Sequence, residues 1–352
     1  MPDLHTTPED RATLEAIDQH QPSVTPPAVE RGEVEFRGKT AIVIGANTGR
    51  GLGCARHLYD MGIKRLILAV RNEDSGLVAR GKLLNEVRPL PASVWEPIQN
   101  PDGYDYPIQP GGNPRPPHLM HLAQHIEVWH LDLASYDSIT AFADRARGLD
   151  RLDFFVNTAD IDNKDFVLNP STGHEEMVQV NYLSPALLTV LMLPILCGKN
   201  PDASSPGHLL HVNYEAASWT KSELPEPDGP PASLFAALDD ETKFDDTRRY
   251  HTTKLLGQLF LAELGKRVPP TVEVFGSTDG VGFAGSMFNR LTHRADNVGG
   301  SQANQTSSSD EIMAPLVHTP EGVKLAEQLW EETMQELEPF EAERTIESLG
   351  RM

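Results

Sequence analysis

The chain has 352 residues, enough for one large α/β domain with appendages or for two small domains. Its 51 acidic and 30 basic side chains give a formal charge of −21, which argues against general binding to nucleic acid or to an anionic membrane surface. It holds only two cysteines, so we expect neither a disulfide framework nor a cysteine-based metal site, and a reducing compartment such as the cytoplasm fits.

The N-terminal residues 1–37 are polar and contain several prolines. This composition predicts an N-terminal arm outside the core. The arm has no apolar stretch of the kind that a signal peptide needs.

The first regular element is predicted over Thr40–Ile44, where an apolar, mostly β-branched run is typical of a buried strand. Gly45, Gly49 and Gly51 follow, and a helix is predicted near Cys54. A strand, a glycine turn and a helix N-terminus together can hold a phosphate, because backbone N–H groups point at the anion and glycine lets it approach closely. An ordinary turn is the alternative. The other residues that would line such a phosphate site are Asn47, Thr48 and Arg50.

Strands and helices then alternate along the chain, which predicts an α/β fold with a Rossmann-like, doubly wound parallel sheet flanked by helices. The helix over 175–197 contains the most apolar run, 186–197, which is too short to span a bilayer and predicts a buried helix. The further strands are predicted over Arg65–Val70, 126–131, 152–157, 209–212 and 271–275. The further helices are predicted over 74–87, Tyr136–Arg147, 250–266 and 320–337.

Composition divides the chain into a single core domain, 38–294, and several appendages. Residues 88–117 are dense in Pro, Gly, Asn and Asp and predict an inserted loop, and 222–246 predict a second polar excursion. Residues 295–312 predict a flexible linker. A C-terminal helical segment is predicted over 313–352.

Several short motifs occur in the order found in one enzyme family, and on them the chain resembles the short-chain dehydrogenases/reductases. More narrowly, it resembles the retinol-dehydrogenase-like reductases common in fungal secondary metabolism. The resemblance covers residues 36–337 apart from the 88–117 loop. It rests on the glycine turn, Val70-Arg71-Asn72, Asp132-Leu133, Asn157-Thr158-Ala159, Val180-Asn181-Tyr182, Tyr250 with Lys254, and the helix that contains Glu321, Gly322 and Trp330.

The resemblance implies a nicotinamide dinucleotide, and Arg71 favours NADP(H). This residue follows the second strand, where the adenosine ribose would sit, and an arginine suits a 2′-phosphate whereas a carboxylate suits a 2′-hydroxyl. A solvated loop arginine is the alternative. Asp132 would accept a hydrogen bond from the adenine amino group; its alternative role is to cap the next helix, for which Ser135 is better placed. The remaining cofactor residues would be Asn72, Leu133, Asn157, Ala159, Lys254 and Gly280.

The catalytic pair would be Tyr250 and Lys254, which are four residues apart and therefore share a helix face. A lysine cation beside the phenol would lower the tyrosine pKa and let it exchange a proton near neutral pH. Asn181 would, by the same resemblance, hold a water that links Lys254 to solvent. An exposed Tyr and Lys on an amphipathic helix is the alternative for an isolated pair.

Several positions depart from the family. Tyr214, preceded by Asn213, stands where the family has its catalytic serine, and Tyr214 or Asn213 could instead position the substrate oxygen. Asp160 replaces the glycine of an Asn-Asn-Ala-Gly turn, and Asp279-Gly280 replaces Pro-Gly. These departures keep two alternatives open: a non-redox step such as cyclisation, isomerisation or dehydration, or a non-catalytic nucleotide-binding protein.

The expected function is an NADP(H)-dependent oxidoreductase that interconverts a carbonyl and an alcohol on a medium-sized, largely apolar small molecule. The resemblance also implies a homo-oligomer built through the two long helices. The acidic charge predicts no nucleic-acid partner, and the length of the apolar run predicts no membrane span. His118, His121 and His125 would share a helical face, but no carboxylate is interleaved and prolines precede them, so no metal site is expected.

Overall fold

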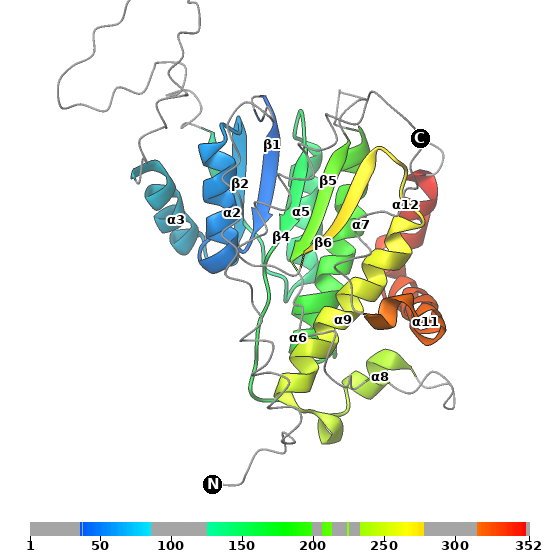
Figure 1. Cartoon of the computed structure of the whole chain (residues 1–352). Coiled ribbons are helices and arrows are strands. Elements are labelled where there is room, and N and C mark those ends of the chain that lie inside the picture. Colours follow the sequence, from blue (N-terminus) through cyan, green and yellow to red (C-terminus); the bar gives the residue numbers. More distant parts are fainter. Residues whose placement is uncertain are drawn as a thin grey trace, which may run out of the picture.

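A computed structural model describes residues 36, 38–85, 125–198, 206–212, 224, 233–277 and 315–349. In these residues six parallel strands form one sheet in the order β3-β2-β1-β4-β5-β6 (Figure 1). The strands are β1 (Thr40–Ile44), β2 (Arg65–Val70), β3 (Ile126–His130), β4 (Phe154–Asn157), β5 (Gly207–Val212) and β6 (Val272–Ser277). The order reverses between β1 and β4, which is where open α/β sheets bind ligands.

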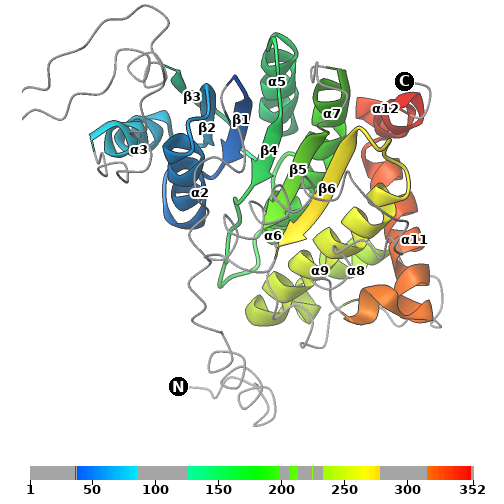
Figure 2. The same ribbon diagram turned by 45° about the horizontal axis from the view of Figure 1, so that its top comes forward.

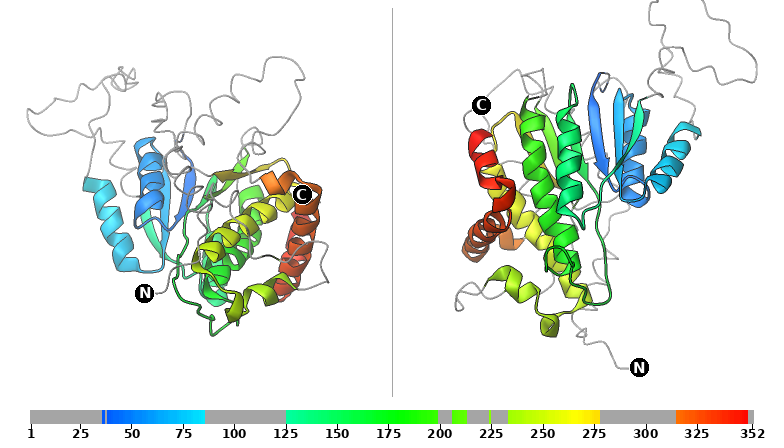
Figure 3. Two further views of the ribbon diagram at one scale, coloured as in Figure 1. Left: turned by 60° about the horizontal axis from the view of Figure 1, so that its bottom comes forward. Right: turned by 180° about the vertical axis from the view of Figure 1, so that it is seen from behind.

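The sheet is buried on both faces, as its apolar strands predict. In β1, Ile42 and Ile44 pack in one core cluster, while Ala41 and Val43 pack in the other. Helices α2 (Gly49–Asp60) and α3 (Glu73–Asn85) cover one face, and α5 (Tyr136–Arg147) and α7 (Ser184–Gly198) cover the other, as the view from behind shows (Figure 3). The predicted Rossmann-like fold class is confirmed.

The long apolar helix predicted over 175–197 is present but contains a change of winding. It consists of α6 (Glu176–Val178), a π-helical segment η2 (Gln179–Leu183) and α7. This run, Glu176–Gly198, is 23 residues long, so by length and composition alone it could cross a membrane, although the apolar run 186–197 within it is shorter than a span needs. Of its most apolar window, 89% is buried inside the molecule, as in the core helix of a folded domain.

The helix predicted over 250–266 begins earlier, as α9 (Asp246–Gly265). Its N-cap is Asp245, whose side chain accepts a hydrogen bond from the Arg248 backbone N–H at 2.9 Å. The predicted start was late because 222–246 was taken to be irregular throughout. The true start matters for the site, because it places Arg249 and Tyr250 inside the first turns of a capped helix.

The C-terminal segment forms η7 (Pro315–His318), α11 (Pro320–Glu336), η8 (Glu338–Phe340) and α12 (Ala342–Leu349). Helix α11 packs on α9, and α12 packs on α7 (Figure 2). Trp330 stacks on Phe260 with ring centroids 5.5 Å apart. In α7, 12 of 15 residues are buried within the chain. The two long helices through which self-association was expected are thus covered by the chain's own C-terminal helices.

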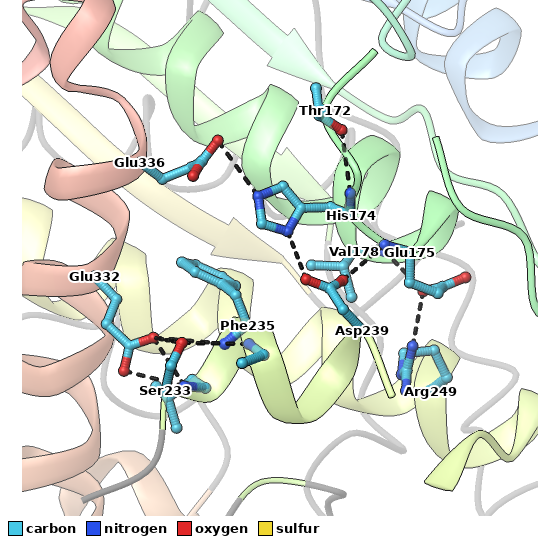
Figure 4. Close-up of polar contacts among 12 residues, drawn as sticks. Thr172, His174, Glu175, Val178, Ser233, Phe235, Asp239, Arg249, Glu332 and Glu336 are labelled. Carbon is cyan, nitrogen blue, oxygen red and sulfur yellow. Dashed lines mark hydrogen bonds and ion pairs between the residues drawn. The ribbon is translucent and has the colours of Figure 1, made fainter. Parts of the chain in front are cut away.

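The excursion predicted over 222–246 contains a short helix, α8 (Leu234–Leu238), and the 3-10 turn η4 (Glu241–Lys243). Glu332 of α11 accepts hydrogen bonds from Ser233 Oγ at 2.9 Å and from the Leu234 backbone N–H at 2.8 Å (Figure 4). The bond from Leu234 satisfies an N–H group at the start of α8 that the helix itself leaves unpaired.

A histidine between two carboxylates joins α8 to the rest of the molecule. His174 Nδ1 lies 2.8 Å from Asp239 Oδ2, and His174 Nε2 lies 3.3 Å from Glu336 Oε1 (Figure 4). Burial disfavours a charged ring, but the hydrogen bonds to Asp239 and Glu336 outweigh burial and raise the pKa of His174 to about 9. We call His174, Asp239, Glu332 and Glu336 the α8 clamp.

The predicted inserted loop 88–117 and linker 295–312 lie outside the described residues, as does the arm 1–37 apart from Phe36.

Candidate active site

A groove of about 470 Å³ lies at the carboxyl ends of β1 to β4, within the roughly 300–1,000 Å³ that ligand pockets usually occupy. Strand register explains its place: Ile44 pairs with Ala69 on one side and with Asn157 on the other. The turns that follow these strands therefore meet at one edge. The predicted cofactor residues among its lining are Gly45, Asn47, Thr48, Gly49, Arg50, Gly51, Arg71, Asn72, Asp132, Leu133 and Ala159.

Close packing, as well as backbone conformation, requires glycine in this turn. Gly45 has a φ of 75°, which favours glycine. A Cβ on Gly51 would lie 2.3 Å from the Gly45 carbonyl oxygen and 2.5 Å from Thr158 Oγ1. Thr158 in turn donates its hydroxyl to the Ile44 carbonyl at 2.6 Å. The turn thus joins β1, the start of α2 and the end of β4 in one tight unit.

The start of α2 faces the groove without a side-chain cap. Its N-cap, Thr48, makes no side-chain capping bond, and the first turn holds no acidic residue. Thr48, Gly49 and Arg50 all line the groove. Uncapped backbone N–H groups, the helix dipole and an arginine together favour an anion at this point.

The far end of the groove is formed by the turns after β2 and β3. Arg71 is exposed and lines it, whereas the Asn72 side chain accepts from the Ser75 backbone N–H at 2.9 Å and so caps α3. Asp132 Oδ1 accepts from the Ala134 backbone N–H at 3.0 Å. The cap of α5 is Ser135, as its position predicts, which leaves Asp132 at the groove instead.

At the other end, Tyr250 and Lys254 both meet a single carboxylate oxygen. Tyr250 Oη donates to Asp160 Oδ2 at 2.9 Å, and Lys254 Nζ lies 2.6 Å from the same oxygen. The Lys254 side chain is 6% exposed and that of Asp160 is 29% exposed. Tyr250 and Asp160 line the groove directly, and Lys254 lies behind them.

Burial and this carboxylate together reverse the expected effect on the tyrosine. Burial and the negative charge of Asp160 raise the pKa of Tyr250, although the resemblance predicted a lowered value. Burial lowers the pKa of Lys254, against the opposing charge of Asp160. Burial favours the neutral acid at Asp160, but the Lys254 cation, the Tyr250 hydroxyl and Arg50 outweigh it and lower the pKa of Asp160. Asp160 is therefore ionised and Tyr250 is protonated at neutral pH.

Asn181 positions the backbone next to Asp160. Its Oδ1 accepts from the Ile161 N–H at 2.8 Å, and its Nδ2 donates to the Ile161 carbonyl at 2.9 Å and to Thr253 Oγ1 at 3.2 Å. It lies in the π-helical segment η2, and π-bulges are frequent at functional sites. Asn181 thus connects η2, the turn after β4 and α9.

Asn157 is buried behind the groove instead of lining it. Its Oδ1 accepts from the Ala159 N–H at 3.2 Å, and its Nδ2 lies 3.4 Å from His211 Nδ1. Burial and the Lys254 cation lower the pKa of His211 to about 4. A neutral histidine therefore lies beneath the site.

Two predicted site residues, Tyr214 and Gly280, lie outside the described residues. His118 and His121 do as well, and the described residues contain no group of three His, Cys, Asp or Glu side chains placed to hold a metal ion. The main omission from the predicted site is Asp160 as a partner of Tyr250 and Lys254. Its signal was present in the sequence as an aspartate at a glycine position of the turn.

Comparison with known proteins gives a consistent result. The chain is 34% identical to the short-chain dehydrogenase fogG of Aspergillus ruber, over 98% of each chain. It is 30% identical to the short chain dehydrogenase virL of Hypocrea virens over 90% of each, and 34% identical to sol3 of Alternaria solani over 68% of this chain and 71% of that one.

Among solved structures, an uncharacterised protein from Mycobacterium paratuberculosis superposes with a TM-score of 0.52 at 21% identity, over 86% of this chain and 95% of that one. This likeness supports the fold. No protein-family model matches the sequence.

Proposed function

The chain belongs to the short-chain dehydrogenase/reductase family, and we propose that it is an NADP(H)-dependent oxidoreductase that interconverts a carbonyl and an alcohol. The observation that carries this proposal is the position of Tyr250. Its hydroxyl lies at one end of a groove whose middle is a glycine turn and whose other end holds Arg71. A proton-exchanging group and a phosphate site in one groove are what this chemistry needs.

The residues present fit a dinucleotide. The tight turn at Gly45 and Gly51 and the start of α2 would hold the pyrophosphate, with Arg50 beside it. Arg71 would bind a 2′-phosphate and Asp132 the adenine amino group. Leu133 and Ala159 would contact the rings, and Asn157 would keep the turn after β4 in place. Gly280 stays a predicted contact. When bound, the nicotinamide supplies or accepts a hydride.

Tyr250 would exchange the proton of the substrate oxygen, and Lys254 would supply positive charge next to it. Asn181 would fix the turn that carries Asp160 and the helix that carries Tyr250, through its bonds to Ile161 and Thr253. Tyr214 stays a predicted group for positioning the substrate oxygen.

The substrate would be a medium-sized, largely apolar small molecule of secondary metabolism, since the relatives are fungal short-chain dehydrogenases. The cytoplasm is the proposed location, and both cysteines are free thiols, as a reducing compartment favours. Because α11 and α12 cover α7 and α9, any homo-oligomer would use another surface.

The test is turnover with and without the Tyr250 hydroxyl. The protein is titrated with NADPH by fluorescence and assayed on a panel of carbonyls and alcohols. Tyr250→Phe should lower turnover by about 100- to 10,000-fold, the usual range for a lost acid–base group, with nearly unchanged cofactor affinity. Tyr136→Phe, which removes a hydroxyl from α5, is the matched control and should keep its activity. Full turnover in Tyr250→Phe would contradict the proposed role.

One observation favours a second candidate, a non-redox step in the same groove. Asp160 contacts both Tyr250 and Lys254, and burial together with the Asp160 charge raises the pKa of the tyrosine. Ordinary carbonyl reduction uses a tyrosine with a lowered pKa. Product detected by mass with no change in NADPH absorbance would favour cyclisation, isomerisation or dehydration. Cofactor binding without any product would favour a non-catalytic nucleotide-binding protein.

A further inference from the structure

Asp160 changes the charge of the site at the point where the reacting end of a cofactor would lie. Its Oδ2 is 2.6 Å from Lys254 Nζ and 2.9 Å from Tyr250 Oη. Lys254 alone would give the site one positive charge. With Asp160 ionised beside it, the charges of Asp160 and Lys254 balance, and of these two groups only Asp160 lines the groove. Arg50, whose cation also acts on Asp160, is the group assigned to the pyrophosphate.

The two redox forms of a nicotinamide cofactor differ in charge at the ring. The oxidised ring is a cation and the reduced ring is neutral, whereas the phosphates are the same in both. An uncompensated lysine disfavours the cationic ring, and a carboxylate facing the groove favours it. Since Asp160 is ionised and only 29% exposed, water screens its field incompletely.

We propose that Asp160 makes the groove select the oxidised nicotinamide cofactor over the reduced one, so that the substrate taken up is an alcohol. This inference rests on the proposed function, which puts the nicotinamide at Tyr250. It adds the direction of the reaction, which is oxidation of the alcohol.

The same carboxylate completes the proton path in that direction. Tyr250 is already protonated and donates to Asp160, so it can accept a proton only by releasing its own. In the oxidation, the carbinol C–H bond breaks and its hydrogen leaves with both bonding electrons, as a hydride that the oxidised nicotinamide would accept. The substrate O–H bond breaks as the carbonyl forms, its proton goes to Tyr250 Oη, and the Tyr250 proton goes to Asp160 Oδ2. The alcohol is oxidised, the nicotinamide is reduced, and Asp160 releases the proton to water.

The test compares affinities for the two redox forms and requires no substrate. The dissociation constants of NADP⁺ and NADPH are measured by calorimetry for the full chain, for Asp160→Asn, which keeps the shape and removes the charge, and for Asp160→Gly, which removes the side chain. The matched control is Asp132→Asn. It removes the same charge from the groove at β3, three strand spacings or about 14 Å from β4.

We expect both Asp160 variants to shift the affinity ratio toward NADPH by about tenfold, equivalent to ~1.4 kcal/mol, and we expect Asp132→Asn to alter both affinities alike. An unchanged ratio in folded Asp160→Asn and Asp160→Gly would overturn the inference while leaving the proposed function in place. A wild-type protein that binds neither form would overturn both.

Discussion

Arg249 and Tyr250 are neighbours in α9, yet they belong to two different regions of the molecule. Arg249 is fully buried, with its Nη1 3.0 Å from Glu175 Oε2, and Glu175 is fully buried as well (Figure 4). Tyr250 lines the groove and donates a hydrogen bond to the partly exposed Asp160. Successive helical residues are about 100° apart. Helix α9 is therefore anchored in the core by Arg249, whereas Tyr250, the next residue, faces the groove.

The same division recurs in η2. Asn181 faces the turn after β4 and holds Ile161, whereas Tyr182 is buried and bonds to Thr333 of α11. The anchor side therefore joins α9 and η2 to their surroundings, and the groove side carries the groups that would meet a cofactor. Substitutions on the anchor side should lower stability, and those on the groove side should change binding or turnover at nearly constant stability.

Arg249→Met should give the largest loss of stability. It leaves the Glu175 carboxylate buried without the Arg249 cation, and breaking a buried pair in this way typically costs about 3–5 kcal/mol. Urea unfolding measures the loss. Tyr250→Phe is the matched comparison on the next residue and should cost less than about 1 kcal/mol.

A double variant separates the ion pair from packing. Arg249→Met with Glu175→Gln should recover part of the loss, because the buried charge is then removed from both sides. Equal stability of Arg249→Met and the wild type would contradict the anchor role of this pair.

On the groove side, Arg71→Asp should weaken NADPH binding relative to NADH by about 10- to 100-fold, the equivalent of roughly 1.4–2.8 kcal/mol, because a charge-assisted contact is replaced by repulsion. The free energy of unfolding should change by less than about 0.5 kcal/mol, as for other exposed positions. Fluorescence and calorimetric titrations measure the affinities.

Lys64→Asp is the control for Arg71→Asp. Lys64 is exposed just before β2. Its replacement by Asp makes the same charge change at the opposite end of that strand, about 20 Å from Arg71. If Arg71→Asp weakened the binding of NADPH and NADH equally, the 2′-phosphate role proposed for Arg71 would be wrong.

The sheet was predictable because its strands are short apolar runs between clear turn residues. Thr40–Ile44, Arg65–Val70 and Tyr136–Arg147 have the predicted bounds. The π-helical segment Gln179–Leu183 was not predicted; its Asn181 bonds to Ile161 and Thr253, which lie far from it in the sequence. Helix α8 was missed because it is short and because its start is held by one carboxylate of α11, Glu332, about a hundred residues further along the chain.

The groove residues were predictable as a set because they follow strands that end at one edge. The effect of one groove residue on the pKa of another was harder to predict. Tyr250 and Lys254 were identified by the family resemblance, but the raised pKa of Tyr250 follows from burial and from Asp160, which reaches the pair from the end of another strand. A helix-face pattern contains no information about such a partner.

The α8 clamp should make stability depend on pH. The folded pKa of His174 is raised to about 9, above the ordinary value near ~6.5 in an unfolded chain. The clamp therefore stabilises the fold fully below pH ~6.5, and this contribution is lost as the pH rises toward 9. His174→Asn should remove about 1–2 kcal/mol at pH 6 and less at pH 9. Parallel slopes of stability against pH in both proteins would contradict this.

The smallest effect is expected for the anchor next to Asn181. Thr333 Oγ1 donates to the Leu329 carbonyl at 2.6 Å, so the Tyr182 hydroxyl donates to Thr333 Oγ1, also at 2.6 Å. Tyr182→Phe removes this one buried hydrogen bond, and we expect a loss of about 1 kcal/mol in urea unfolding, with cofactor affinity unchanged.

The residue before it gives the contrast that sharpens the comparison. Asn181→Ala removes the bonds to Ile161 and Thr253 and should weaken cofactor binding, because the turn that carries Asp160 is then less well held. A cycle of Tyr182→Phe, Thr333→Val and the double variant isolates the pair, and a coupling near zero would mean that the hydroxyl contact contributes no stability. If Tyr182→Phe weakened cofactor binding as much as Asn181→Ala, the two sides of η2 would not be separate, and the division between anchor and groove would fail at this helix.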